Sequence, residues 1–203
     1  KTSAISGKTR ELLMNDLKAG MGTWISGQSL GERLAMTRSA VWKQICVLKE
    51  EGYVIESSPR KGYRLCEVPD FLLIREIRDG LATRTLGQRD IRYYRQTDST
   101  NLRARELAAQ GLPEGTLVVA EEQTQGRGRL GRNWFSPPLQ GIYASLILRP
   151  SIPPHEAPRM TLLSSVAVAE AILSLTPLAV KIKWPNDILV GGRKIAGILT
   201  EIS

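Results

Sequence analysis

The sequence has little of the chemistry on which hydrolytic and metal-dependent enzymes rely. Its 203 residues include one histidine, His155, and two cysteines, Cys46 and Cys66. A lone histidine beside Pro153-Pro154 does not suit a Ser-His-Asp or Cys-His unit, and no His/Cys cluster has metal-ligand spacing. No carboxylate pair has a spacing recognisable for glycoside hydrolysis. Two cysteines are too few for a disulfide framework, so we expect a reducing, cytoplasmic compartment and no protein-bound metal.

Long apolar runs are also missing. No stretch approaches the roughly 18 apolar residues of a membrane span, and the start Lys1-Thr2-Ser3-Ala4 has no apolar signal core. We therefore expect no membrane partner. An apolar fraction of 42% and a charged fraction of 24% are typical of globular proteins, and the net charge of +8 favours anionic partners.

Acidic residues are absent from 123–155, a segment that holds four arginines. Three of them stand with three glycines in residues 126–132 (Gly-Arg-Gly-Arg-Leu-Gly-Arg), which we call the Arg-Gly loop. Glycine lets backbone N–H groups approach a ligand, and arginine supplies a permanently charged planar fork. The composition predicts a phosphate- or carboxylate-binding loop. Taken alone, it also fits a solvated basic loop or an unstructured RNA-contacting segment.

The Arg-Gly loop formally matches the dinucleotide pattern G-x-G-x-x-G at Gly126, Gly128 and Gly131. That pattern requires a helix opening at the third glycine and an acidic residue about 20 positions later. Pro137-Pro138 does not suit a helix interior, and no acid appears before Glu156. A Gly-Lys-Ser/Thr ending is absent as well, so neither a Rossmann site nor a P-loop is predicted.

Residues 1–66 are predicted to form a winged helix-turn-helix domain. They carry 11 Lys/Arg against 6 Asp/Glu. Apolar spacing predicts three helices, with Ser26 and Thr37 as N-caps of the second and third. The third would bury Val41, Ile45 and Leu48 and would end at Gly52. Two short strands, at 53–55 and 62–65, are predicted to frame a basic hairpin.

Basic and polar residues cluster where such a domain meets DNA. Four share the exposed face near the start of the third helix, and two lie in the hairpin, where they could touch phosphates. The predicted DNA-binding residues are Arg38, Ser39, Trp42, Lys43, Arg60 and Lys61. One alternative is a protein-binding module without any DNA contact. Another is that Trp42 simply packs in a core.

Residues 67–80 are predicted as a linker, with a helix at 70–80 capped by Asp70. Residues 81–203 are predicted as a second domain. There a strand at 91–95 leads to a cluster of short polar side chains, Thr97-Asp98-Ser99-Thr100-Asn101, which opens a helix at 102–109. An apolar helix within 153–175 is expected in the core.

Lysine alternates with apolar residues at 180–184, which predicts a strand that turns Ile182 and Trp184 to the core and Lys181 and Lys183 away from it. A hairpin is expected over 188–202, with Lys194 just past its tip.

The polar groups that remain are arginines, lysines, glycines and hydroxyls. Such a set suits a reaction that depends on positioning and on charge neutralisation. Activation of a carboxylic acid by ATP fits, because the substrate carboxylate is itself the nucleophile and the protein must offset the repulsion between two anions.

Three segments resemble the signatures of biotin protein ligases, in that family's order and spacing. They are residues 126–134 (Gly-Arg-Gly-Arg-Leu-Gly-Arg-Asn-Trp), 183–187 (Lys-Trp-Pro-Asn-Asp) and 194–199 (Lys-Ile-Ala-Gly-Ile-Leu). The preceding winged helix resembles the bifunctional subgroup, in which the ligase also represses biotin synthesis genes. The resemblance implies an α+β protein whose helix-flanked mixed sheet is class II synthetase-like. It also implies more sheet and a small β-domain beyond residue 203, so the catalytic domain is expected to be incomplete.

The resemblance implies biotin, ATP and Mg²⁺ as ligands, and biotinyl-5′-AMP as the intermediate. It implies the biotin carboxyl carrier protein and operator DNA as partners, and a homodimer in the adenylate-bound state. By resemblance, the biotin-binding residues are Ser99, Thr100, Asn101, Gln123, Gly126, Arg127, Gly128, Arg129, Trp134 and Lys183. The ATP- or adenylate-binding residues are Arg127, Arg129, Arg132, Lys183, Asn186 and Lys194, and the catalytic residues are Lys183, Arg127, Arg129 and Asp187.

Two other functions compete with a ligase that is also a repressor. One is a biotin-responsive transcription factor with little or no ligase activity. The other is a general nucleic-acid-binding protein whose Arg-Gly loop contacts phosphates.

Overall fold

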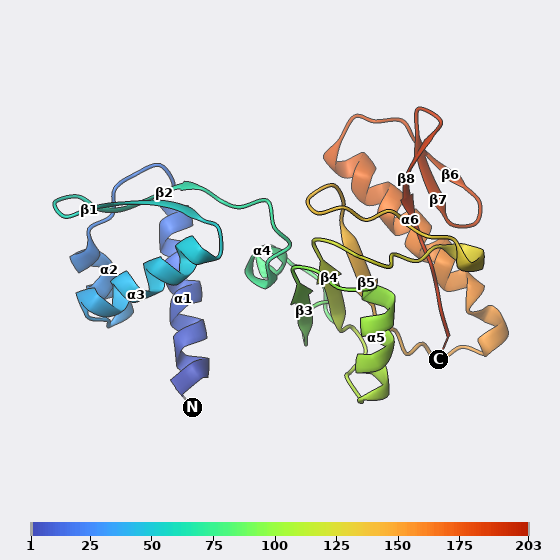
Figure 1. Cartoon of the computed structure of the whole chain (residues 1–203), viewed down its shortest axis with the longest axis horizontal. Helices are drawn as coiled ribbons and strands as arrows, with labels where there is room; N and C mark the ends of the chain where they lie inside the picture. Colours follow the sequence, from blue (N-terminus) through green and yellow to red (C-terminus); the bar gives the residue numbers. More distant parts are fainter. Residues whose placement is uncertain (1, 203) are drawn as a thin grey trace. The chain divides into compact units, whose positions relative to one another are not determined.

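The computed structural model describes the backbone of residues 2–202 and the side chains of residues 9–202. The chain divides into two compact units, residues 1–71 and 72–203 (Figure 1). The division falls inside the segment predicted as a linker. The predicted domain limits of 1–66 and 81–203 stay predictions.

The first unit has the three helices and the hairpin that the sequence predicts. Its helices are α1 (Thr2–Ala19), α2 (Gly27–Leu34) and α3 (Arg38–Glu50), and its strands are β1 (Val54–Ser58) and β2 (Gly62–Glu67). Both predicted caps are confirmed, because the side chains of Ser26 and Thr37 accept hydrogen bonds from the backbone N–H of Ser29 and Ala40. The core takes the predicted α3 stripe together with leucines of the other helices and of β2.

The hairpin is longer than predicted. β1 runs to Ser58, so the loop between the strands is only residues 59–61. Gly62 is needed at its end, since its φ is +97° and a Cβ there would lie 2.1 Å from the Ile25 carbonyl oxygen.

The predicted linker helix is wrong in extent and in cap. Helix α4 covers only Ile74–Arg78, its N-cap is Leu73, and no side chain caps it. Asp70 lies in a bend ahead of it. The Glu121 carboxylate fixes this segment instead, by accepting a hydrogen bond of 2.7 Å from the Leu72 N–H.

The second unit contains a mixed sheet, as the resemblance implies. Strands β3 (Ile91–Tyr94) and β4 (Leu117–Ala120) are parallel, and β5 (Tyr143–Leu146) is antiparallel to β4. Helix α5 (Thr100–Ala109) packs on β4 and β5 through Ala104, Val118 and Ile147. A parallel pair needs a crossover, and α5 supplies it, so the start of α5 lies beside the end of β4.

A second sheet is an antiparallel meander of β6 (Val180–Lys183), β7 (Asp187–Val190) and β8 (Arg193–Gly197). The sequence interpretation needs two corrections here. Ile182 and Trp184 are 41% and 77% exposed, so they do not face a core. The hairpin is shorter than predicted, since β8 ends at Gly197 rather than near residue 202, while Lys194 lies just past the tip, as predicted.

The apolar helix α6 (Pro158–Leu175) lies beside β6 and β7. The prediction that it is a core helix is wrong for the described residues, because only Ser165 and Ala169 are buried. Two short strands cannot cover an apolar surface that runs around most of the helix. By length and composition alone, Pro154–Leu175 meets the criterion for a membrane span, which core helices of soluble proteins also meet.

Candidate functional site

The Arg-Gly loop is an ordered hairpin, not an unstructured segment. The Gly128 N–H donates to the Arg132 carbonyl at 2.7 Å, and Arg127 and Asn133 form an antiparallel bridge. At the tip, a 3-10 turn covers Arg129–Gly131, with Leu130 90% exposed and at a φ of 57°. The three arginines are therefore carried by an ordered backbone that is hydrogen-bonded to itself.

Gly126 anchors the base of the loop. A Cβ at this position would lie 2.2 Å from the Trp134 carbonyl oxygen and 2.6 Å from Ser136 Oγ. The Trp134 N–H donates to the Gly126 carbonyl at 2.8 Å. Only glycine allows the two chain segments to approach this closely.

One open pocket of about 410 Å³ brings together the three sequence segments of the predicted site. The Arg-Gly loop and Trp134 form one wall, residues 183–187 form another, and Lys194 completes it. The predicted site residues in its lining are Gly128, Arg129, Arg132, Trp134, Lys183, Asn186, Asp187 and Lys194. Four of these eight are cations and one is a carboxylate, so the pocket suits an anion.

Asn186 ties the Arg-Gly loop to the meander. It is 8% exposed, and its Oδ1 accepts a hydrogen bond of 2.8 Å from Arg129 Nη1. Its Nδ2 donates to the Ile198 carbonyl at 3.2 Å. Both ends of the amide are thus engaged, which fixes the Arg129 guanidinium at the edge of the pocket.

Lys194 makes two contacts within the pocket. Its Nζ lies 2.7 Å from Asp187 Oδ1 and 5.0 Å from the centroid of the Trp134 ring. A cation over an indole face is attracted by the ring quadrupole. Lys194 therefore holds the Trp134 ring beside the pocket. It also pairs with Asp187, which is the one carboxylate in the pocket lining.

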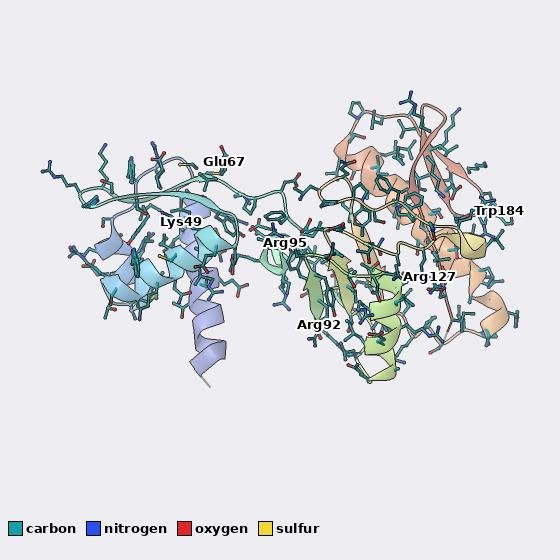
Figure 2. The ribbon with its side chains drawn as sticks, viewed as in Figure 1. Lys49, Glu67, Arg92, Arg95, Arg127 and Trp184 are labelled. Atoms are coloured by element: carbon teal, nitrogen blue, oxygen red, sulfur yellow. The ribbon has the colours of Figure 1, made fainter. Side chains whose placement is uncertain are left out.

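Lys183 ends β6 and is exposed, as is its neighbour Trp184, which Figure 2 labels. Within residues 9–202, no hydrogen bond or ion pair engages the Lys183 ammonium. It is available to an incoming anion, in contrast to Lys194.

A hydrogen-bonded chain connects the polar cluster at the start of α5 to the base of the Arg-Gly loop. Gln123 Oε1 accepts from the Thr100 N–H at 2.8 Å and contacts Thr100 Oγ1 at 3.0 Å. Gln123 Nε2 donates to Ser136 Oγ at 3.0 Å, and Ser136 Oγ donates to the Trp134 carbonyl at 3.0 Å. The Ser145 hydroxyl, from β5, bonds Thr100 Oγ1 and Asn101 Oδ1. The amide of Gln123 is thereby held in one orientation.

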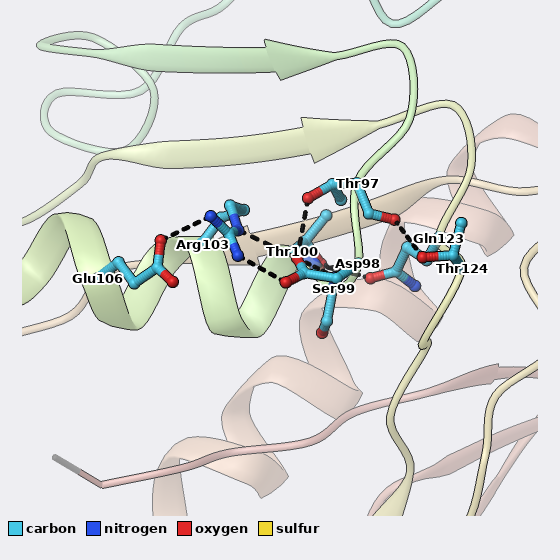
Figure 3. A network of polar contacts seen from close by, with 8 residues as sticks. All are labelled: Thr97, Asp98, Ser99, Thr100, Arg103, Glu106, Gln123 and Thr124. Carbon is cyan, nitrogen blue, oxygen red and sulfur yellow. Dashed lines mark hydrogen bonds and ion pairs between the residues drawn. The ribbon is translucent and has the colours of Figure 1, made fainter.

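Asp98 braces the same helix start (Figure 3). Its Oδ1 accepts from the Ser99 N–H at 2.6 Å, and both of its oxygens bond the Arg103 guanidinium, at 3.0 and 2.5 Å. The hydrogen bonds from Arg103 lower the pKa of Asp98 to about 2, and the Ser99 N–H adds to this effect against partial burial. Ser99 is the N-cap residue of α5, but its side chain makes no cap hydrogen bond.

Arg127 is not part of the pocket lining and pairs with Glu201. The Arg127 Nη1 to Glu201 Oε1 distance is 3.2 Å, and Asn101 Nδ2 donates to Glu201 Oε2 at 3.0 Å. The predicted site therefore forms two groups: the pocket around Lys183, and a polar network of Ser99, Thr100, Asn101, Gln123 and Arg127.

Sequence reasoning missed four side chains that hold these groups: Asp98, Ser136, Ser145 and Glu201. Asp98 stands within the predicted polar cluster, but it was given no role in the site. The other three stand in segments with no local signal, and only the fold brings them near the cluster.

No cluster of three metal-ligating side chains occurs within residues 9–202. Asp187 is the one pocket carboxylate, and Lys194 already pairs with it. Mg²⁺ often binds through one or two carboxylates and the phosphates of a nucleotide, so the residues present fit Mg²⁺ that arrives with ATP better than a resident metal.

The first unit exposes all six residues predicted to bind DNA. Trp42 is 56% exposed, which contradicts the alternative in which it packs in a core. Arg38, Ser39, Lys43, Arg60 and Lys61 are exposed as well. Lys61 and Arg64 lie over the Trp24 ring, 5.8 and 4.9 Å from its centroid, so an aromatic residue steadies the basic hairpin.

Comparisons with known proteins agree with both units. Residues 9–64 match the model of an HTH domain. The chain is 50% identical over 179 residues to the bifunctional ligase/repressor BirA of Bacillus subtilis (strain 168), across 88% of this chain and 55% of that protein. It is 36% identical over 185 residues to the protein of that name from Escherichia coli (strain K12), across 90% of this chain and 55% of that protein. The chain thus spans about half the length of the curated relatives it matches.

Among solved structures, a biotin protein ligase from Aquifex aeolicus in complex with biotin and ATP aligns with a TM-score of 0.50. The two share 35% sequence identity, across 57% of this chain and 47% of that one. Residues 93–202 match the model of the Biotin/lipoate A/B protein ligase family, which is more than half of the chain. The chain therefore belongs to the Biotin/lipoate A/B protein ligase family.

Proposed function

We propose that the protein is a biotin protein ligase that also represses biotin synthesis genes. It forms biotinyl-5′-AMP from biotin and ATP, and it transfers biotin to a lysine of the biotin carboxyl carrier protein. The observation that carries this proposal is the single pocket in which the Arg-Gly loop, Lys183 and Lys194 meet.

In the first half-reaction, a carboxylate oxygen of biotin attacks the α-phosphorus of ATP, and pyrophosphate leaves. Both reactants are anions, so catalysis requires cations that are already positioned. Lys183 is the free ammonium of the pocket, and it neutralises the carboxylate and the phosphoryl oxygens as they approach. Arg129 and Arg132 bind phosphate oxygens from the opposite wall.

In the second half-reaction, the amine of the acceptor lysine attacks the acyl carbon of the mixed anhydride, and AMP leaves. The attacking amine must be uncharged. Asp187 is the one carboxylate of the pocket lining that can accept its proton, once its ion pair with Lys194 opens. Lys194 is then released to bind phosphate.

The polar network supplies the biotin end of the site. Ser99, Thr100, Asn101 and Gln123 offer hydroxyl and amide groups at the start of α5, and Gly126, Arg127 and Gly128 stand beside them. Mg²⁺ enters as the ATP complex and offsets charge on the phosphates.

Incubation with biotin, MgATP and acceptor protein, followed by a streptavidin blot, tests the ligase. We expect acceptor labelling that requires both substrates. No labelling would favour the second candidate, a biotin-responsive transcription factor, which the exposed basic face of α3 also supports.

The Lys183→Ala variant tests the catalytic assignment. We expect adenylate formation to fall at least about a hundredfold, because a charge directed at the reacting groups is worth several kcal/mol. Pyrophosphate release measures it. A rate near that of the unaltered protein would exclude the role, and Lys181→Ala, on the same strand but outside the pocket lining, is the matched control.

The repressor function rests on the first unit. The start of α3 would enter the major groove, and the hairpin would touch phosphates. We further propose that adenylate binding favours a homodimer that spans two half-sites of the operator, and that the protein works in the cytoplasm.

A further inference from the structure

Glu201 places a carboxylate on two residues of the proposed biotin site. Its Oε1 lies 3.2 Å from Arg127 Nη1, and its Oε2 accepts a hydrogen bond of 3.0 Å from Asn101 Nδ2. These partners come from different elements, since Asn101 is in the first turn of α5 and Arg127 is in the Arg-Gly loop. Glu201 itself lies in the segment after β8. Three parts of the unit thus converge on one carboxylate.

This carboxylate neutralises Arg127. The pocket arginine Arg129 bonds an uncharged amide at Asn186, whereas Arg127 pairs with a full negative charge. An anionic ligand group that reaches for Arg127 therefore competes with a carboxylate already present, while an uncharged ligand group meets no such competitor.

We infer that Glu201 is a specificity-determining residue for the end of the ligand that faces Arg127. Its carboxylate stands in for a ligand anion at Arg127, and so it reduces the preference of the site for a charged ligand over its uncharged analogue. The inference rests on the proposed function, because it takes biotin as the ligand and directs the biotin carboxylate at Arg127 as well as at Lys183.

A purely structural role for Glu201 makes a different prediction. If Glu201 only held Arg127 and Asn101 in place, its loss would weaken the binding of charged and uncharged ligands by the same factor. The Glu201→Gln variant separates the two, because glutamine can still accept the hydrogen bond from Asn101 but carries no charge toward Arg127.

Calorimetry with biotin and with biotinamide, its uncharged carboxamide, measures the effect. For Glu201→Gln we expect Kd for biotin to fall about fivefold, the upper end for a partly exposed ion pair, while Kd for biotinamide stays within about twofold. Glu156→Gln is the matched control, since Glu156 pairs with Arg159 at 2.7 Å in the same unit, and within residues 9–202 no hydrogen bond or ion pair joins it to a predicted site residue. It should leave both values unchanged.

An Arg127→Gln background completes the test. There, Glu201→Gln should no longer change the ratio of the two Kd values, because the competition needs the Arg127 charge. Equal weakening of both ligands by Glu201→Gln, an unchanged ratio, or a ratio change that persists without Arg127 would each overturn the inference. Failure of the unaltered protein to bind biotin would instead overturn the proposed function.

Discussion

Single side chains in this protein act mainly by holding other side chains. Asn186 fixes Arg129, Lys194 lies against Trp134, and Gln123 joins α5 to the base of the Arg-Gly loop. Each of these three residues lies in or beside the proposed site, and each connects two segments that are far apart in the sequence. The positions of the charged groups are thus set before a ligand arrives, which is the condition under which electrostatic stabilisation is most effective.

Asp98 yields a prediction about stability and pH. Its pKa lies below the usual 3.8, at about 2, mainly because of Arg103. A carboxylate with a lowered pKa stabilises the folded state above about pH 4, and this contribution is lost as the pH falls toward 2. We expect Asp98→Asn to lower the free energy of unfolding by about 1 kcal/mol at pH 7, after allowance for solvent screening, and by much less near pH 2.

Urea unfolding at several pH values measures this difference. Asp90→Asn, which removes a surface carboxylate paired with Arg92, makes the same change in net charge and is the control. A difference between Asp98→Asn and the unaltered protein that stays constant from pH 7 to pH 2 would contradict the assignment.

Gly126 yields a prediction about the Arg-Gly loop. An alanine Cβ would lie 2.2 Å from the Trp134 carbonyl oxygen, so backbone must move and the hydrogen bond from Trp134 to Gly126 must stretch. We expect Gly126→Ala to lower the free energy of unfolding by about 2 kcal/mol and to make the loop more susceptible to proteolysis. A Cβ at Gly128 would lie 3.3 Å from its nearest neighbour, the Arg132 carbonyl oxygen. Gly128→Ala should therefore lower the free energy of unfolding clearly less than Gly126→Ala. Equal losses in both variants would contradict the packing argument.

At the scale of elements, sequence pattern and observed structure agree best where a local signal sets the boundary. Helix α3 begins at its Thr37 cap and buries the predicted stripe, because hydroxyl capping and the 3.6-residue period are local properties. Helix α4 and strand β8 differ from prediction, because their ends depend on contacts made elsewhere. Leu72 bonds Glu121, and Lys194 joins β8 through pairing with Leu189.

The exposed face of α3 yields a prediction about DNA binding. We expect Arg38→Ala and Lys43→Ala to weaken operator binding and to reduce the slope of log K against log salt by about one each if each neutralises one phosphate. Adenylate synthesis should be unaffected. Fluorescence anisotropy over a salt series measures both effects.

Lys49→Ala is the matched control for the α3 variants. Lys49 lies in the last turn of the same helix, and its Nζ donates to Ser57 Oγ at 3.0 Å (Figure 2). It should leave operator affinity within about twofold, because recognition helices meet DNA through their N-terminal residues. Equal losses in Lys43→Ala and Lys49→Ala would point to general charge attraction instead of a docked helix.

At the scale of the whole molecule, each of the two units has its own fold, and the apolar surface of the second is not all buried. On α6, Leu163, Val166 and Leu173 are 62%, 44% and 53% exposed and recur at three- and seven-residue intervals on one side of the helix. These three side chains, here called the α6 stripe, flank the exposed Glu170, and exposed apolar side chains on one side of a helix attract other apolar molecules.

The α6 stripe yields a prediction about dye binding. We expect the chain of residues 1–203 to enhance ANS fluorescence, and we expect Leu163→Ser with Leu173→Ser to remove most of that signal. The melting temperature should change by less than about 3 °C, because mostly exposed leucines lose little burial on substitution. A large drop in melting temperature would show that these leucines are packed.

The mixed sheet of the second unit was implied by the resemblance to biotin protein ligases. The sequence by itself determined the caps and stripes of the first unit and the residue types that can neutralise anions. These follow from local spacing and side-chain chemistry. Only the tertiary structure decided that, among the described residues, Lys183 is unpaired while Lys194 is paired. It also decided that Arg127 meets Glu201 and that α6 exposes its apolar side. Each of these depends on which segments lie side by side, and partners up to a hundred residues apart leave no local pattern in the chain.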